Sequence, residues 1–178
     1  SSEETLRDIL KKVEERSEET LRHNERVLEE VRKEVERILR RNEEVLRRLE
    51  KEAKELKKRG GEREKVERLL KELRRINEES RKEAERLVRE LKRVSREHLE
   101  ESKRLLEELD KVLKSLEPDE RLKRVVDDLE RRIRELLERD ERVIRRTEEE
   151  ARRLLDDVRR VVEELDKRAE DVVKEVKD

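Results

Sequence analysis

The chain has 178 residues, of which 60% are Asp, Glu, Lys or Arg, and it contains no Phe, Trp, Tyr, Cys or Met. The 53 basic and 54 acidic residues leave a formal net charge of −1 at pH 7. Without cysteine there is neither a disulfide nor a thiolate metal site, and no apolar run approaches the roughly 20 residues of a membrane span. Balanced charge without aromatic residues argues against a nucleic-acid surface and against a membrane-surface helix.

The order of the apolar residues predicts a folded helical chain, although so high a charge can also mean disorder. The hydrophobic residues, 30% of the total, recur at helical spacing along almost the whole sequence. Gly60, Gly61 and Pro118 are the only glycines and the only proline, and they divide the chain into three segments of similar length. The missing methionine predicts a processed N-terminus that remains after removal of a tag.

The first predicted helix spans about residues 2–59. Ser1 to Glu4 has the spacing of a capping box, in which a serine side chain and a glutamate three residues later satisfy free backbone N–H groups. Basic residues at 57–59 suit the negative end of the helix dipole. Gly60 is expected to end the helix in the left-handed conformation.

The second predicted helix spans about residues 62–116 and the third about 120–177, with Asp119 as the N-cap of the third. At 1.5 Å per residue, each helix is about 85 Å long. Short connections make consecutive helices antiparallel neighbours. The predicted fold is therefore all-α: a single domain over residues 1–178, formed by a long up-down-up antiparallel three-helix bundle similar to a coiled coil.

Each helix carries an apolar seam whose steps alternate between three and four residues, with an occasional extra step of four, such as Val27 to Val31 to Val35. In the second helix, for example, the expected inward positions include Leu105, Leu109 and Val112. Further apolar residues beside the seams, such as Leu46 and Leu106, widen the stripe. That width is typical of a bundle rather than of a two-stranded coiled coil.

Almost every uncharged polar residue falls on a seam or next to it, and a simple register brings these residues together. Residues that face each other should have numbers adding up to about 121 across the first turn and about 236 across the second, because antiparallel helices rise equally. Two clusters of polar side chains result. The larger contains Ser17, Thr20, His23, Asn24, Ser95, His98, Ser102 and Asp140; the smaller contains Asn42, Asn77 and Ser80, with Asp156 beside the seam as a candidate fourth member.

The favoured interpretation of these clusters is a structural network of hydrogen bonds that sets the register of the helices. Buried polar groups are costly unless they are paired, so they penalise misaligned packing. Asp140 is expected to bond to His98 and Asn24, with His23 at the flank. Thr147 has no polar partner in this register and is expected to bond its own helix backbone.

Two chemical alternatives remain for the same residues. His23, His98 and Asp140 could hold zinc with one open position, although the chain has no thiolate and no Glu-x-x-His pair. His98 and Asp140 could also act in acid–base catalysis. A phosphate-binding glycine loop and a nucleophile elbow are both missing from the sequence, so we expect no enzyme activity, no metal and no cofactor.

Capped helices of equal length, an aliphatic core, Glu/Lys/Arg surfaces and isolated polar layers extend over the whole chain. In these features the chain resembles computationally designed helical bundles with buried hydrogen-bond networks. The resemblance implies a synthetic, soluble protein without a natural location, cytoplasmic on recombinant expression, and it implies no activity. Long capped helices with a continuous aliphatic core also predict a hyperstable fold that melts above about 90 °C.

The expected function is that of a monomeric structural scaffold, with no required protein partner and with neither nucleic acid nor membrane as a partner. The alternative is an interaction module. In that case the chain would be one component of a heterodimer or a homo-oligomer and would complete a larger helical bundle.

Overall fold

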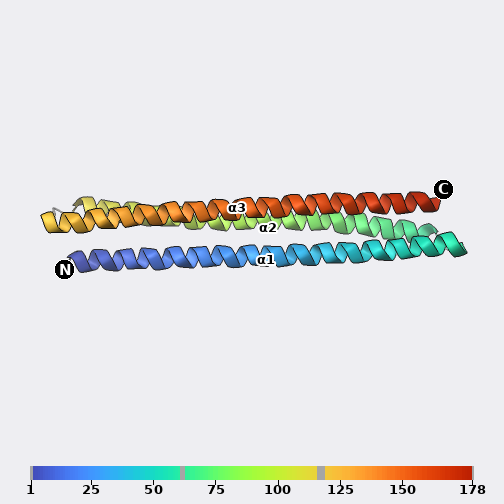
Figure 1. Ribbon diagram of the computed structural model, residues 1–178, viewed down its shortest axis with the longest axis horizontal. Coiled ribbons are helices and arrows are strands. Elements are labelled where there is room, and N and C mark those ends of the chain that lie inside the picture. The colour runs from blue at the N-terminus through green and yellow to red at the C-terminus, as the bar shows by residue number, and fades with distance from the viewer. Residues whose placement is uncertain (1, 61–62, 116–118, 178) are drawn as a thin grey trace. The chain divides into compact units, whose positions relative to one another are not determined.

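The computed structural model describes residues 2–60, 63–115 and 119–177 (Figure 1). These residues form three helices, α1 (Ser2–Arg59), α2 (Arg63–Ser115) and α3 (Glu120–Lys177), and they include no strand. The helices pack against one another with α2 antiparallel to its neighbours, so the predicted all-α three-helix bundle is confirmed. The expected roles of Ser1, Gly61 and Pro118 lie outside the described residues.

The helix ends form where short-range sequence signals place them. Gly60 has a φ of 69°, and its N–H donates to the carbonyl oxygen of Leu56 at 3.0 Å, which confirms the left-handed stop of α1. At the start of α3, Asp119 Oδ1 accepts a hydrogen bond of 2.8 Å from the backbone N–H of Leu122. Asp119 is therefore the N-cap of α3, as predicted.

Replacing Asp119 with Ala should lower the free energy of unfolding by about 1 kcal/mol, because the N–H of Leu122 loses its acceptor. Asp119→Ser is the matched control, since a serine hydroxyl also accepts this bond, and it should stay within about 0.5 kcal/mol of the parent. Guanidinium chloride unfolding followed by circular dichroism measures both. An alanine variant as stable as the parent would show that the cap contributes nothing.

The chain divides into two compact units, and each contains a part of all three helices. Unit 1 consists of Ser1–Leu28 and Glu90–Glu150, and unit 2 consists of Glu29–Arg89 and Ala151–Asp178. The single domain over residues 1–178 stays a prediction.

Each unit has its own aliphatic core, to which α1, α2 and α3 all contribute. Burying one Leu, Ile or Val side chain stabilises a fold by about 1.5–3 kcal/mol relative to its exposure, so these clusters dominate the stability of the units. The core of unit 1 contains Leu6, Val13, Leu106, Leu109, Leu113, Val126, Leu129, Ile133 and Leu136. The core of unit 2 contains Val45, Leu46, Leu49, Val66, Leu73, Ile76, Leu165, Ala169 and Val173.

Near the end of α2 the inward face differs from the predicted seam. Val112, expected to point inward, is 46% exposed, whereas the next residue, Leu113, is only 3% exposed. Leu106 is likewise buried, while Leu105 is only half-buried. A straight α-helix falls about 20° behind a seven-residue repeat in every heptad. Over the several heptads of α2 this lag moves the inward face to the following residue.

Candidate functional site

The polar residues on the predicted seams are buried within the two units, except for the two histidines of unit 1. His23 and His98 are half-buried. The buried members are Ser17, Thr20, Asn24, Ser95, Ser102 and Asp140 in unit 1, and Asn42, Asn77 and Ser80 in unit 2.

Two of the buried hydroxyls bond within their own helix and join no helices. Thr20 Oγ1 donates to the carbonyl oxygen of Arg16, and Thr147 Oγ1 donates to that of Val143, each at 3.0 Å. The backbone partner expected for Thr147 is therefore confirmed. For Thr20 the local bond replaces a contact across the cluster.

Ser17 and Asp140 connect α1 with α3 in unit 1. The Ser17 hydroxyl donates to Asp140 Oδ1 at 2.6 Å, and Asp140 is only 3% exposed. Arg139 lies beside this pair: its guanidinium donates to Ser17 Oγ at 2.9 Å, and its Nε is 3.8 Å from Asp140 Oδ1. No sequence pattern distinguishes Arg139 from the other arginines, because surface arginines occur throughout the chain.

The partner of Asp140 differs from the sequence-based expectation. Asn24 does not donate to it, because Asn24 Nδ2 has no hydrogen-bond partner, while Asn24 Oδ1 accepts from the Ser95 hydroxyl at 3.2 Å. Within residues 2–60, 63–115 and 119–177 no hydrogen bond links Asp140 to His23 or His98. The two imidazoles instead contact each other, with ring centroids 5.5 Å apart and ring planes inclined by 60°.

Unit 2 contains two further polar contacts between helices. Asn42 Nδ2 of α1 donates to Ser80 Oγ of α2 at 3.2 Å, and the Ser80 hydroxyl donates to the backbone oxygen of Ile76 at 2.6 Å. Asn77 Nδ2 of α2 donates to Asp166 Oδ1 of α3 at 2.5 Å. The candidate Asp156 is exposed, so Asp166 is the aspartate of this cluster.

One displacement of α3 along α2 explains why Asp140 does not meet His98 and why Asp166, rather than Asp156, joins the polar cluster of unit 2. Across α1 and α2, the residue numbers of His23 and His98 add up to 121, as the first turn predicts. Across α2 and α3, the numbers of paired residues add up to 243 or 244 instead of about 236. Those pairs are Asn77–Asp166, Arg74–Glu170, Glu85–Arg159, Arg96–Glu148 and Lys103–Glu141. In each unit, α3 thus lies about two helical turns further along α2 than the prediction assumed, which separates Asp140 from His98.

Loss of contact with water raises the pKa of buried Asp140 and of half-buried Asp166 above the ordinary value for an aspartate. For Asp140 the hydrogen bond from Ser17 and the positive charge of Arg139 act in the opposite direction but do not offset the loss of water. Burial likewise raises the pKa of Asp166, against the hydrogen bond from Asn77. The folded protein therefore binds a proton at these sites more readily than the unfolded chain does.

Replacing Asp140 with Asn should stabilise the fold most at pH 7 and progressively less as the pH falls towards about 4. The raised pKa means that ionised Asp140 costs stability above its folded-state pKa, and protonation removes this cost as the pH falls through that pKa. Hydrogen bonds from Arg37 and Arg86 lower the pKa values of Glu34 and Glu83. Protonation of these two carboxylates at low pH therefore destabilises the variant and the parent alike. Guanidinium chloride unfolding of variant and parent at each pH isolates Asp140; a difference independent of pH would contradict the prediction.

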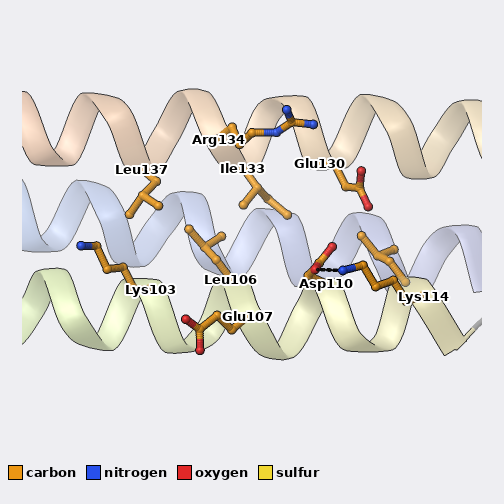
Figure 2. A pocket seen from close by; sticks show the side chains of 10 residues that line it. Lys103, Leu106, Glu107, Asp110, Lys114, Glu130, Ile133, Arg134 and Leu137 are labelled. Atoms are coloured by element: carbon orange, nitrogen blue, oxygen red, sulfur yellow. Dashed lines mark ion pairs between the residues drawn. The ribbon is translucent and has the colours of Figure 1, made fainter.

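An open groove of about 550 Å³ lies between α2 and α3 in unit 1 (Figure 2). Leu106, Ile133 and Leu137 form part of its apolar lining. Charged side chains of both signs surround it, including the Asp110–Lys114 ion pair at 3.0 Å. Leu106 and Ile133 also belong to the buried core of unit 1, so the groove exposes only a narrow apolar floor inside a charged border.

The structure does not support the zinc alternative, because the described residues include no group of three or more His, Asp or Glu that could hold a metal ion. Over the same residues, no helix combines the length and the apolar character needed to cross a membrane.

No protein-family model matches the chain, and no curated protein matches its sequence. Among solved structures, the chain is similar to one described as "Computationally designed three helix bundle". The alignment covers 98% of this chain and 86% of the other, with 21% sequence identity and a TM-score of 0.46. At these values the fold assignment rests on the three helices of the chain itself.

Proposed function

We propose that the chain is a de novo designed structural scaffold, a monomeric three-helix bundle without a natural biochemical activity, in which polar core layers set the helix register. Its composition supports this proposal, since 60% charged residues without any aromatic residue depart far from ordinary globular proteins. The observation that carries it is the pattern of polar side-chain bonds: in each unit, two such bonds connect all three helices.

In unit 1, Asn24–Ser95 joins α1 to α2 and Ser17–Asp140 joins α1 to α3. In unit 2, Asn42–Ser80 joins α1 to α2, and Asn77 with Asp166 joins α2 to α3.

These bonds penalise a change of register in a way that the aliphatic seams do not. If one helix slides by a turn, Leu and Val side chains meet other aliphatic side chains, and the apolar contact changes little. The same movement separates each polar pair, and every buried group left unsatisfied costs about 1–3 kcal/mol. Two polar pairs in each unit, which together join all three helices, therefore favour one alignment of the helices.

The test is to remove the polar layer of unit 2 and measure the register. A polar-free variant would carry Asn42→Leu, Asn77→Leu, Ser80→Ala and Asp166→Leu. Spin labels on cysteines introduced at exposed Lys82 of α2 and Asp171 of α3 report the distance between the helices, and the chain has no other cysteine.

The parent should give one narrow distance distribution, and the polar-free variant should give a broad or multiple one while keeping its helix content. Thr147→Val is the control, because this hydroxyl bonds only its own helix, and it should preserve the narrow distribution. An equally narrow distribution in the polar-free variant would refute the register role.

The alternative function is an interaction module, for which the groove between α2 and α3 supplies a narrow apolar contact surface. Light scattering after gel filtration separates the two functions. A mass near 21.9 kDa supports the scaffold, and an integer multiple of it supports assembly. The scaffold should also melt above about 90 °C, and a cooperative transition below about 60 °C would contradict it.

A further inference from the structure

The geometry points to a two-histidine site for a late first-row transition-metal ion, Cu²⁺ above all, between His23 of α1 and His98 of α2. These are the only two histidines of the chain, and both lie in unit 1. Neither takes part in the polar bonds between helices from which the scaffold function is argued. The site goes beyond that function and does not depend on it.

The separation of the rings suits one shared ion. When two imidazoles bind one metal, each nitrogen lies about 2.0–2.1 Å from it, which puts the ring centroids about 5 Å apart at a tetrahedral angle. The observed centroids are 5.5 Å apart, so small side-chain rotations bring both rings into range. The ring planes are inclined by 60° in an edge-on contact, so rotation about the side-chain bonds of the histidines would be needed to point one nitrogen of each ring at the shared ion.

The surroundings favour an ion that keeps water ligands. On the inner side of the histidine pair, Asn24 and Ser95 are fully buried and bonded to each other. Asn24 directly follows His23 in the sequence, and Ser95 lies about one helical turn before His98. The histidines themselves are half-buried, so an ion can reach them from solvent. Since the described residues supply no third His, Asp or Glu ligand, water would complete the coordination sphere.

The type of ligand selects the metal. Neutral imidazole suits Cu²⁺, Ni²⁺ and Zn²⁺, whereas Mg²⁺ and Ca²⁺ prefer oxygen ligands. Among divalent first-row ions, Cu²⁺ binds a given nitrogen site most tightly. No thiolate competes, because the chain has no cysteine. The 54 acidic residues provide a weak background of carboxylate binding that any divalent ion can occupy.

Titration with Cu²⁺ alone, in a buffer that does not bind metals, tests the site in the full chain. Calorimetry should show one tight equivalent of Cu²⁺, and electron paramagnetic resonance should show coupling to two imidazole nitrogens. Mg²⁺ should give only the weak background. Because a folded-state ligand stabilises the fold, saturating Cu²⁺ should also raise the denaturation midpoint.

His23→Gln and His98→Gln should each weaken the tight equivalent by about tenfold or more, since each removes one of the two nitrogen ligands. Exposed Glu100→Gln on α2 is the control for carboxylate binding and should leave the affinity unchanged. Circular dichroism checks that each variant keeps its helix content. If a histidine variant unfolds, the electron paramagnetic resonance spectrum of the parent with Cu²⁺ still tests the site. Coupling to fewer than two imidazole nitrogens in that spectrum would overturn the proposal. Equal affinity and stoichiometry in the parent and a folded His23→Gln/His98→Gln variant would overturn it as well.

Discussion

Replacing Ser17 with Val should destabilise the protein by about 3 kcal/mol at pH 7. The Ser17 hydroxyl is the hydrogen-bond donor to the carboxylate of Asp140, which is buried against α1 at 3% exposure. Valine fills the space but cannot donate, so a buried carboxylate loses its bond. Arg139 would also lose the serine oxygen that accepts from its guanidinium. Leaving a buried carboxylate without its hydrogen-bond donor costs more than losing a typical neutral hydrogen bond, because the charged group stays away from water.

Guanidinium chloride unfolding of Ser17→Val beside Thr20→Val measures this effect. Thr20 is buried in the same unit, but its hydroxyl bonds only the carbonyl of Arg16 in its own helix, so its loss should cost less than about 1 kcal/mol. In a double-mutant cycle, adding Asp140→Leu to Ser17→Val should recover most of the loss, since no charge remains to be satisfied. A cost for Ser17→Val no larger than that for Thr20→Val would contradict the pairing.

Replacing Leu113 with Ala should cost about 3 kcal/mol, whereas Val112→Ala should change the stability by less than about 0.5 kcal/mol. Leu113 is 3% exposed and belongs to the aliphatic core of unit 1, while its neighbour Val112 is 46% exposed. Truncating a buried leucine loses its transfer free energy and leaves a cavity. Truncating the exposed valine removes little contact.

The comparison of these two variants decides which residue of α2 faces the core. Both changes shorten an aliphatic side chain at the same end of the same helix, so fraying affects them alike. Val→Ala gains a few tenths of a kcal/mol more helix propensity than Leu→Ala, which is small beside the expected difference of about 3 kcal/mol. Denaturant unfolding with an unchanged slope measures the difference in stability. Equal costs, or a larger cost for Val112→Ala, would support the predicted seam, in which Val112 faces inward.

The sequence by itself determined the secondary structure and the helix ends, because the interactions behind them are local. Gly60 ends α1 through its own backbone conformation, and Asp119 caps α3 through a residue three positions away. Helical periodicity also separated the polar seam positions from the charged surface, and residues such as Asn42 and Asn77 are buried. The axial alignment of α1 with α2 could also be predicted, because the connection between them is short. The contact between His23 and His98 agrees with that alignment.

Only the tertiary structure decided which buried polar groups meet. The predicted partners of Asp140 assumed that α3 starts level with the end of α2, but the pairs between these helices are displaced by about two turns in each unit. Asp140 therefore meets Ser17, and Asn77 meets Asp166 rather than Asp156. The axial position of a helix minimises the packing energy of all its contacts together. Neither helix propensity nor the hydrophobic repeat specifies that axial position. Every shift of α3 by whole helical turns still places an aliphatic face against an aliphatic face.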